Sequence, residues 1–189
     1  MKGYEKVIRG LDFAKTADGA TQKTILQSEA EFRMLCAWIE KKEVKSFLEL
    51  GFFSGALMTA LDKMYGFQKV GGADDGEAAR RRGIEPRFPK SARLCHTKLE
   101  TPEYRRYRHD LGKVDLVFID ADHSYGAVRQ DYERERKQPH RFLAFHDIKN
   151  TEHAPGVVRL WNELGGKKKE LVSPESGMGI GIWSMRETP

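Results

Sequence analysis

The chain has 189 residues and a mass of 21.6 kDa, a length that suits one globular domain. Hydrophobic residues make up 39% of it and charged residues 32%, which excludes a disordered chain and a membrane protein. With 33 Lys and Arg against 28 Asp and Glu, the net charge of +5 would attract an anionic ligand or nucleic acid but identifies neither.

Residues 1–23 are polar and irregular, and 1–27 are predicted to form an N-terminal arm ahead of a single domain at 28–189. Ser28 and Glu31 have the spacing of a capping box, which signals the start of a helix. Helices are predicted at about 28–42, 54–65, 75–82, 124–137 and 155–164, with a helical or irregular stretch at 102–111. Strands are predicted at 44–50, 68–74, 92–96, 114–120 and 142–146, followed by a closing hairpin at 169–173 and 179–185.

The alternation of strands and helices predicts an α/β fold. Segment 114–120, with the sequence VDLVFID, is apolar on both faces, as a central strand of a parallel sheet must be. We expect a Rossmann-like, mostly parallel sheet of seven strands, with helices on both faces and an antiparallel C-terminal hairpin. Ligands bind such sheets beyond the carboxyl ends of the strands, so those ends should carry the functional residues.

No stretch approaches the roughly 18–20 apolar residues that a membrane helix needs. The first ten residues are charged and lack the apolar region of a secretory signal. The two cysteines, Cys36 and Cys95, stand far apart among apolar neighbours, without zinc-binding spacing. We therefore expect two buried free thiols in a cytoplasmic protein.

The ends of the first two strands suggest a nucleoside site. Gly51 and Gly55 flank a tight turn in which glycine lets a ligand approach the main chain, and Glu49 offers an acceptor beside it. Asp74 follows Gly51 by 23 positions, where an acid binds ribose hydroxyls in nucleotide-binding sheets. The alternatives are a glycine turn with no ligand and an acid at Asp74 or Asp75 that only caps the next helix.

The ends of two later strands carry carboxylates and imidazoles. Asp120, Asp122 and His123 follow the fourth strand, and His146 and Asp147 end the fifth. Neighbouring parallel strands would bring these groups together, where they could hold Mg²⁺ or Mn²⁺. A metal-free polar site is the alternative, and Asp122 and His123 could simply cap the following helix.

Three segments carry a resemblance to a known family. They are LELGFFSG at 48–55, VDLVFIDADHSYGAVRQDYE at 114–133 and FLAFHDI at 142–148. The chain resembles class I S-adenosylmethionine (SAM)-dependent methyltransferases. It is most similar to the small-molecule O-methyltransferase branch, which includes catechol O-methyltransferase and the cephalosporin hydroxylase and macrocin O-methyltransferase-like proteins. Many other class I members have glycine where Phe53 stands.

The resemblance implies an enzyme that uses SAM and a role for each strand end. The methionine part of SAM would pass along the first turn, next to Glu49, Gly51, Phe53, Ser54 and Gly55. Asp74 would hold the ribose hydroxyls, and His96 and Thr97 would flank the adenine. Cys95-His96 is an unusual pair for that loop.

The resemblance also implies catalytic and metal-binding residues. Asp120 matches the first cation ligand and would also lie at the cofactor, while His146 and Asp147 match the second and third ligand positions, where acid plus amide is the commoner pair. His123 falls where the catechol enzymes carry their base. Either His123 or His146 would be the base if no cation is bound.

Two rival functions remain open on the sequence. Basic runs at 80–82, 105–108 and 167–169 would suit phosphates, which keeps a nucleic-acid (RNA) methyltransferase as an alternative. Base N-methyltransferases typically carry an Asn/Asp-Pro-Pro-aromatic motif where this chain reads Asp120-Ala121-Asp122-His123. The other rival is a non-catalytic binding protein with the cofactor fold. A nicotinamide enzyme is disfavoured because G-x-G-x-x-G is missing after the first strand.

For partners, the sequence favours a small-molecule acceptor over nucleic acid and predicts no membrane contact. A homo-oligomer is compatible with it. The three tryptophans are expected in the core rather than at an interface; they are Trp38, Trp161 and Trp183.

Overall fold

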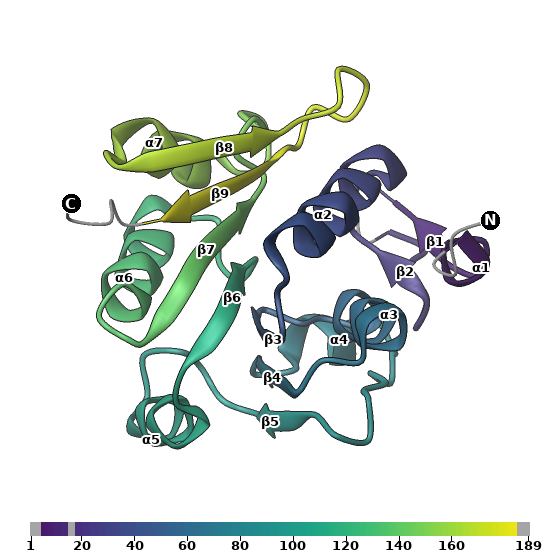
Figure 1. The fold of residues 1–189 in the computed structure, drawn as a ribbon, viewed down its shortest axis with the longest axis horizontal. Helices are drawn as coiled ribbons and strands as arrows, with labels where there is room; N and C mark the ends of the chain where they lie inside the picture. The colour runs from purple at the N-terminus through teal and green to yellow at the C-terminus, as the bar shows by residue number, and fades with distance from the viewer. Residues whose placement is uncertain (1–4, 15–17, 185–189) are drawn as a thin grey trace.

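The computed structural model describes residues 5–14 and 18–184 (Figure 1). Its helices are α1 Glu5–Ile8, α2 Glu29–Lys42, α3 Ala56–Tyr65, α4 Glu77–Arg81, α5 Pro102–Leu111, α6 Tyr125–Glu135 and α7 Pro155–Glu163. Its strands are β1 Asp12–Phe13, β2 Thr24–Ile25, β3 Ser46–Leu50, β4 Lys69–Ala73, β5 Arg93–Cys95, β6 Val114–Ile119, β7 His140–His146, β8 Lys167–Leu171 and β9 Ile180–Ser184.

The main sheet has seven strands in the order β5-β4-β3-β6-β7-β9-β8. The first five strands in that order pair in parallel, while β9 runs antiparallel to both β7 and β8. This confirms the predicted fold class, including the closing hairpin. The carboxyl ends of β3 to β7 therefore meet at one edge of the sheet, where the candidate residues were expected.

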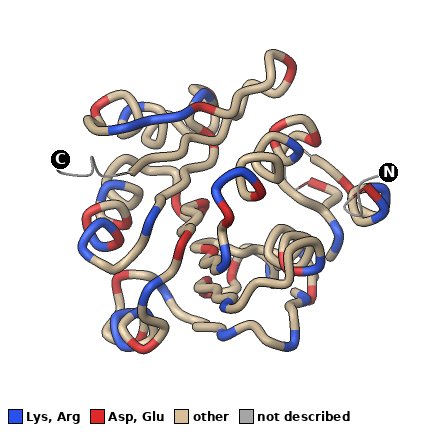
Figure 2. The backbone as a smooth tube through the Cα atoms, in the orientation of Figure 1, with Lys and Arg blue, Asp and Glu red and all other residues tan. Residues whose placement is uncertain are grey.

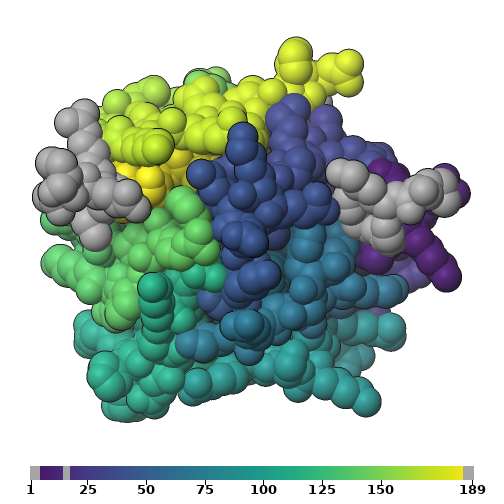
Figure 3. All heavy atoms as spheres, in the orientation of Figure 1, coloured from purple at the N-terminus to yellow at the C-terminus, as the bar shows by residue number. Residues whose placement is uncertain are grey.

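The sheet is covered by helices on both faces, as the alternating side chains of its strands require. In β6, Leu116 and Phe118 pack with α2 and α3 on one face. Val117 and Ile119 of the same strand pack on the other face with α5, α6 and α7. Figure 3 shows α2 in deep blue, seated between the C-terminal hairpin and α3.

The tryptophans lie in the core as predicted, because Trp38, Trp161 and Trp183 are each at most 5% exposed. Both cysteines are free; Cys36 is buried and Cys95 only partly so. Among the described helices, none is both long and apolar enough to cross a membrane.

The N-terminal segment is more ordered than its sequence pattern predicts. Its described part contains α1 and a small parallel sheet of β1 and β2. Ile8 and Ile25 join the core, with exposures of 3% and 1%, and anchor this segment to the domain. The expected irregular conformation was therefore wrong here. The boundary between arm and domain remains a prediction, and residues 1–4, 15–17 and 185–189 lie outside the described residues.

The start of α2 follows the prediction, but one half of the capping box does not. The Ser28 hydroxyl oxygen accepts the N–H of Glu31 at 3.2 Å. The Glu31 carboxylate turns inward instead, where it accepts hydrogen bonds from the N–H groups of Ser173 and Gly179 at 3.3 and 2.9 Å and from the Ser176 hydroxyl. A carboxylate buried this deeply needs such donors, so Glu31 ties α2 to the β8–β9 turn.

Two of the three basic runs have structural roles. Arg108 is 1% exposed and donates to the Glu135 carboxylate at 2.7 Å, so this arginine cannot provide the phosphate contact that the rival nucleic-acid function would use. Residues 167–169 form part of β8, the edge strand of the sheet, and appear as a blue stretch in Figure 2. Lysines on an edge strand prevent it from pairing with another chain.

Candidate functional site

One large cavity, of about 1050 Å³, runs along the carboxyl ends of β3 to β7. Its volume lies at the upper end of the range for ligand pockets, roughly 300–1000 Å³. The predicted site residues in its wall are Gly51, Phe53, Asp74, Thr97, Asp120, His123, His146 and Asp147. The cavity thus joins the nucleoside half and the carboxylate–imidazole half of the predicted site.

The turn after β3 is shaped by a close approach of two strands. Gly51 has φ +83°, and a Cβ built there would lie 2.1 Å from the carbonyl oxygen of Asp120. Gly55 has φ +75° and lies against the carbonyl of Arg87, so chain packing rather than a ligand explains that glycine. Ser54 is buried, and its hydroxyl donates to the carbonyl of Thr24 at 3.3 Å.

Asp74 is fixed by backbone groups at the cavity wall. Its carboxylate accepts the N–H of Phe53 at 3.0 Å and that of Gly76 at 2.6 Å. Phe53 itself has φ +45°, a strained value for a residue with a side chain, and this hydrogen bond helps to hold it. Burial raises the pKa of Asp74. Gly76 is the N-cap of α4, and Asp75 before it accepts the N–H of Glu77, the first residue of the helix, at 2.9 Å.

Of three other predicted cofactor residues, one lines the cavity and two lie outside its lining. Thr97 lines the cavity. His96 lies outside that lining, with its ring edge-on to Phe52 at a centroid distance of 5.7 Å. Glu49 is 3% exposed beneath the turn, where burial and then the Asp120 charge raise its pKa well above the ordinary value.

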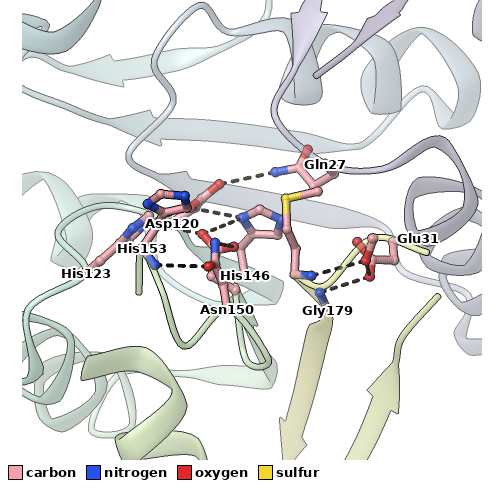
Figure 4. Close-up of polar contacts among 11 residues, drawn as sticks. Gln27, Glu31, Asp120, His123, His146, Asn150, His153 and Gly179 are labelled. Atoms are coloured by element: carbon pink, nitrogen blue, oxygen red, sulfur yellow. Dashed lines mark hydrogen bonds and ion pairs between the residues drawn. The ribbon is translucent and has the colours of Figure 1, made fainter. Parts of the chain in front are cut away.

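Two carboxylates and two imidazoles meet at the ends of β6 and β7 (Figure 4). His146 Nδ1 lies 3.4 Å from Asp120 Oδ1 and 3.3 Å from Asp147 Oδ2. His123 Nε2 lies 3.5 Å from the same two oxygens. The expected juxtaposition of these four residues is therefore present.

Opposite charges dominate the electrostatics of this cluster. Burial alone would raise the pKa of Asp120, yet the His146 and His123 imidazoles hold it below its ordinary value. Burial alone would lower the pKa of His146, yet the Asp120 and Asp147 carboxylates raise it. The hydrogen bond to Asp120 also raises the pKa of His123. The carboxylates and the imidazoles thus stabilise each other's charged forms.

The donor set suits a divalent cation. One ligand atom each from Asp120, His146 and Asp147 lies within 4.8 Å of the other two. Two carboxylate oxygens with one imidazole nitrogen suit Mn²⁺ or a similar transition metal better than Mg²⁺, which prefers an all-oxygen set. Asp147 has φ +63° and accepts the side-chain N–H of Asn150 at 2.9 Å, so its unusual backbone is supported.

Asp122 and His123 have separate roles. Asp122 accepts the backbone N–H of Ser124 at 2.7 Å, but the residue that caps α6 is Ser124, whose hydroxyl oxygen accepts the N–H of Ala127 at 3.4 Å. His123 is turned toward Asp120 and Asp147 instead. The wall also includes residues that the sequence analysis missed: Asn150, His153 and Met178.

Gln27 was also missed, and its amide donates to Asp120 Oδ2 at 3.2 Å (Figure 4). Asn150 is a polar residue three positions after Asp147, and this closeness in sequence could have suggested it. No sequence signal points to Gln27, because its contact with Asp120 spans 93 residues of chain.

The cavity is acidic although the chain as a whole is basic. Among the residues that the structure describes, Arg82, Lys98 and Arg134 are the ones that bring a fixed positive charge to its wall. Nine acidic residues of the described ranges lie in the wall: Asp18, Asp74, Asp75, Glu77, Glu100, Asp120, Asp122, Asp131 and Asp147. Such a surface favours cationic or neutral ligands over polyanions.

No protein-family profile and no curated protein sequence matches this chain. Solved structures do match it. An O-methyltransferase from Bacillus cereus, in complex with S-adenosylhomocysteine (SAH), is 14% identical over 96% of this chain and 90% of its own, with a TM-score of 0.57. The O-methyltransferase TomG from Streptomyces achromogenes, in complex with SAM, is 12% identical over 84% and 81%, with a TM-score of 0.56.

Fibrillarin from Aeropyrum pernix, with natively bound SAM, is 15% identical over 82% of this chain and 76% of its own, with a TM-score of 0.54. At these identities the likeness shows the fold. The chain has the fold of the class I SAM-dependent methyltransferases, as the sequence resemblance implied.

Proposed function

We propose that this protein is a SAM-dependent methyltransferase that methylates a hydroxyl oxygen of a small molecule, with a divalent cation held by Asp120, His146 and Asp147. The observation that carries the proposal is the single cavity that contains both Asp74 and the carboxylate–imidazole cluster. The same fold holds SAM or SAH in proteins of similar structure, two of them O-methyltransferases.

The first half of the cavity suits the cofactor. Asp74 presents a carboxylate whose position is set by two backbone N–H groups, as binding two ribose hydroxyls requires. Gly51 and Phe53 form the wall beside it, and Thr97 lines the far side. A sulfonium cofactor also matches the negative charge of this cavity.

The second half suits deprotonation of a hydroxyl. When bound, SAM supplies a methyl group for an in-line displacement, in which the acceptor oxygen bonds to the methyl carbon while the carbon–sulfur electron pair stays with sulfur and leaves SAH. His123 accepts the hydroxyl proton on Nδ1, because its Nε2 faces the carboxylates of Asp120 and Asp147, which stabilise the imidazolium that forms. A divalent cation would supply charge that orients the hydroxyl and lowers its pKa.

The nature of the acceptor follows from the charge of the wall. The nine acidic residues would repel a phosphate backbone, and Arg108 is buried against Glu135. An RNA acceptor therefore has less support than a neutral or cationic small molecule. The alternative of a non-catalytic binding protein leaves the convergence of His123, Asp120 and Asp147 without a role.

The cofactor half is tested by replacing Asp74 with asparagine. We expect the affinity for SAH to fall about 10- to 100-fold, because a hydrogen bond to a charged group contributes about 1.5–3 kcal/mol. Isothermal titration calorimetry of SAH into both proteins measures this directly. Asp110→Asn, on the exposed side of α5, is the control and should bind as the wild type does.

The outcome separates the candidate functions. Equal affinity for SAH in Asp74→Asn and wild type would contradict the assignment of Asp74. No SAH binding by the wild type, with Mn²⁺ and without it, would exclude the methyltransferase and favour a binding protein. Acceptor turnover that requires Mn²⁺ or Mg²⁺ supports the cation, whereas full turnover in a chelator leaves His123 as a base in a metal-free site.

A further inference from the structure

We propose that Gln27 is a positioning residue of the cation site, whose amide N–H holds one oxygen of Asp120 and so sets the orientation of that carboxylate. This inference rests on the proposed function, because it assumes a cation at Asp120, His146 and Asp147. Gln27 belongs to the N-terminal segment, outside every motif that identified the site.

The two carboxylate oxygens of Asp120 have different partners. Gln27 Nε2 donates to Oδ2 at 3.2 Å. Oδ1 lies 3.4 Å from His146 Nδ1 and 3.5 Å from His123 Nε2. A carboxylate with a separate partner on each oxygen cannot rotate freely, so the amide of Gln27 keeps Oδ1 directed at the imidazoles. Hydrogen bonds of this kind orient metal-binding carboxylates and tune their affinity.

The burial of Gln27 argues against a purely structural role. Its side chain is 2% exposed, and its Oε1 is buried with no hydrogen-bond partner in the part of the chain that the structure describes. An amide with an unpaired oxygen is less stable in the interior than an apolar side chain of similar size. Packing alone would therefore favour leucine here, and the contact with Asp120 is what distinguishes the glutamine.

The backbone around Gln27 is anchored on both sides, which gives the amide a fixed position. Before it, Ile25 is 1% exposed in the core and the carbonyl of Thr24 accepts the Ser54 hydroxyl at 3.3 Å. After it, Ser28 caps α2. The N-terminal segment thus connects the turn after β3 to the cation cluster. A site on rigid elements holds its geometry better than one on a free loop.

The test replaces Gln27 with leucine and measures binding of Mn²⁺ to the full chain by calorimetry and by electron paramagnetic resonance. We expect the affinity for Mn²⁺ to fall about 10- to 100-fold, as is usual when a partner of a metal ligand is lost. The melting temperature should stay the same or rise, and the affinity for SAH should not change. Gln22→Leu, a half-buried residue of the same segment outside the cavity lining, is the matched control.

Each outcome decides the matter. Wild-type affinity for Mn²⁺ in Gln27→Leu would overturn the inference, as would an equal loss of SAH and Mn²⁺ affinity, since that reports a general change in structure. Gln27→Met serves as a second apolar variant if the leucine variant does not fold. If the wild type binds SAH but no Mn²⁺, the cation part of the proposed function fails and this inference with it.

Discussion

Replacing Glu135 with alanine is expected to lower the free energy of unfolding by about 3–5 kcal/mol, because it leaves the charge of Arg108 buried and unpaired. Arg108 is 1% exposed and Glu135 is fully buried. The two are joined by a hydrogen bond of 2.7 Å, and the Tyr104 hydroxyl donates to the other Glu135 oxygen at 2.6 Å. Urea unfolding followed by circular dichroism measures the loss.

The matched control is an ion pair on the surface of α5, the helix that carries Arg108. Arg106 and Glu103 form an ion pair at 3.1 Å with side chains 70% and 58% exposed. Glu103→Ala should change stability by less than about 1 kcal/mol, because exposed ion pairs contribute little. A Glu135→Ala protein as stable as Glu103→Ala would contradict the buried network.

This network also bears on the site, although it lies at the other end of the strands from the carboxylate–imidazole cluster. Arg108 donates to the carbonyl of Gly112 at 2.7 Å, just before β6, and to that of Pro139 at 3.2 Å, just before β7. It therefore fixes the starting ends of the two strands whose other ends carry Asp120 and His146. We expect loss of the network to disturb the cluster through the strands.

The fold was predictable because its signals are local. Helix 28–42 follows from the spacing of its apolar residues and strand 114–120 from its continuous apolar run. The parallel sheet follows from the alternation of strands and helices. The topology then brought Asp120, His146 and Asp147 together, because neighbouring parallel strands end at the same edge. The site residues that the sequence indicated are those at strand ends.

The missed features depend on contacts between distant segments. Glu31 has the spacing of a capping box, yet its carboxylate bonds to the β8–β9 turn, more than a hundred residues away. Arg108 looks like part of a basic surface run, but Glu135 draws it into the interior. Gln27 precedes a helix start and shows no pattern of its own. Local composition cannot reveal a partner that only the folded chain supplies.

Gly51→Ala is expected to destabilise the protein by about 2–5 kcal/mol and to abolish binding of SAH. Gly51 has φ +83°, where a side chain costs about 1–2 kcal/mol. Its new Cβ would also lie 2.1 Å from the Asp120 carbonyl oxygen and 2.6 Å from the Ala121 Cα. Both are backbone atoms, so the end of β6 must shift, and overpacking of this kind costs a further ~1–3 kcal/mol.

Gly66→Ala is the control that measures the cost of a positive φ without a close approach of another strand. Gly66 has φ +55°, yet a Cβ there would meet nothing within 4 Å. We expect it to lose only about 1–2 kcal/mol and to bind SAH as the wild type does. Chemical unfolding and SAH calorimetry on both variants give the comparison. Equal stability and equal SAH affinity would show that β3 and β6 do not meet at Gly51. A larger loss in Gly51→Ala, with SAH binding gone, would tie the cofactor turn to the strand that carries Asp120.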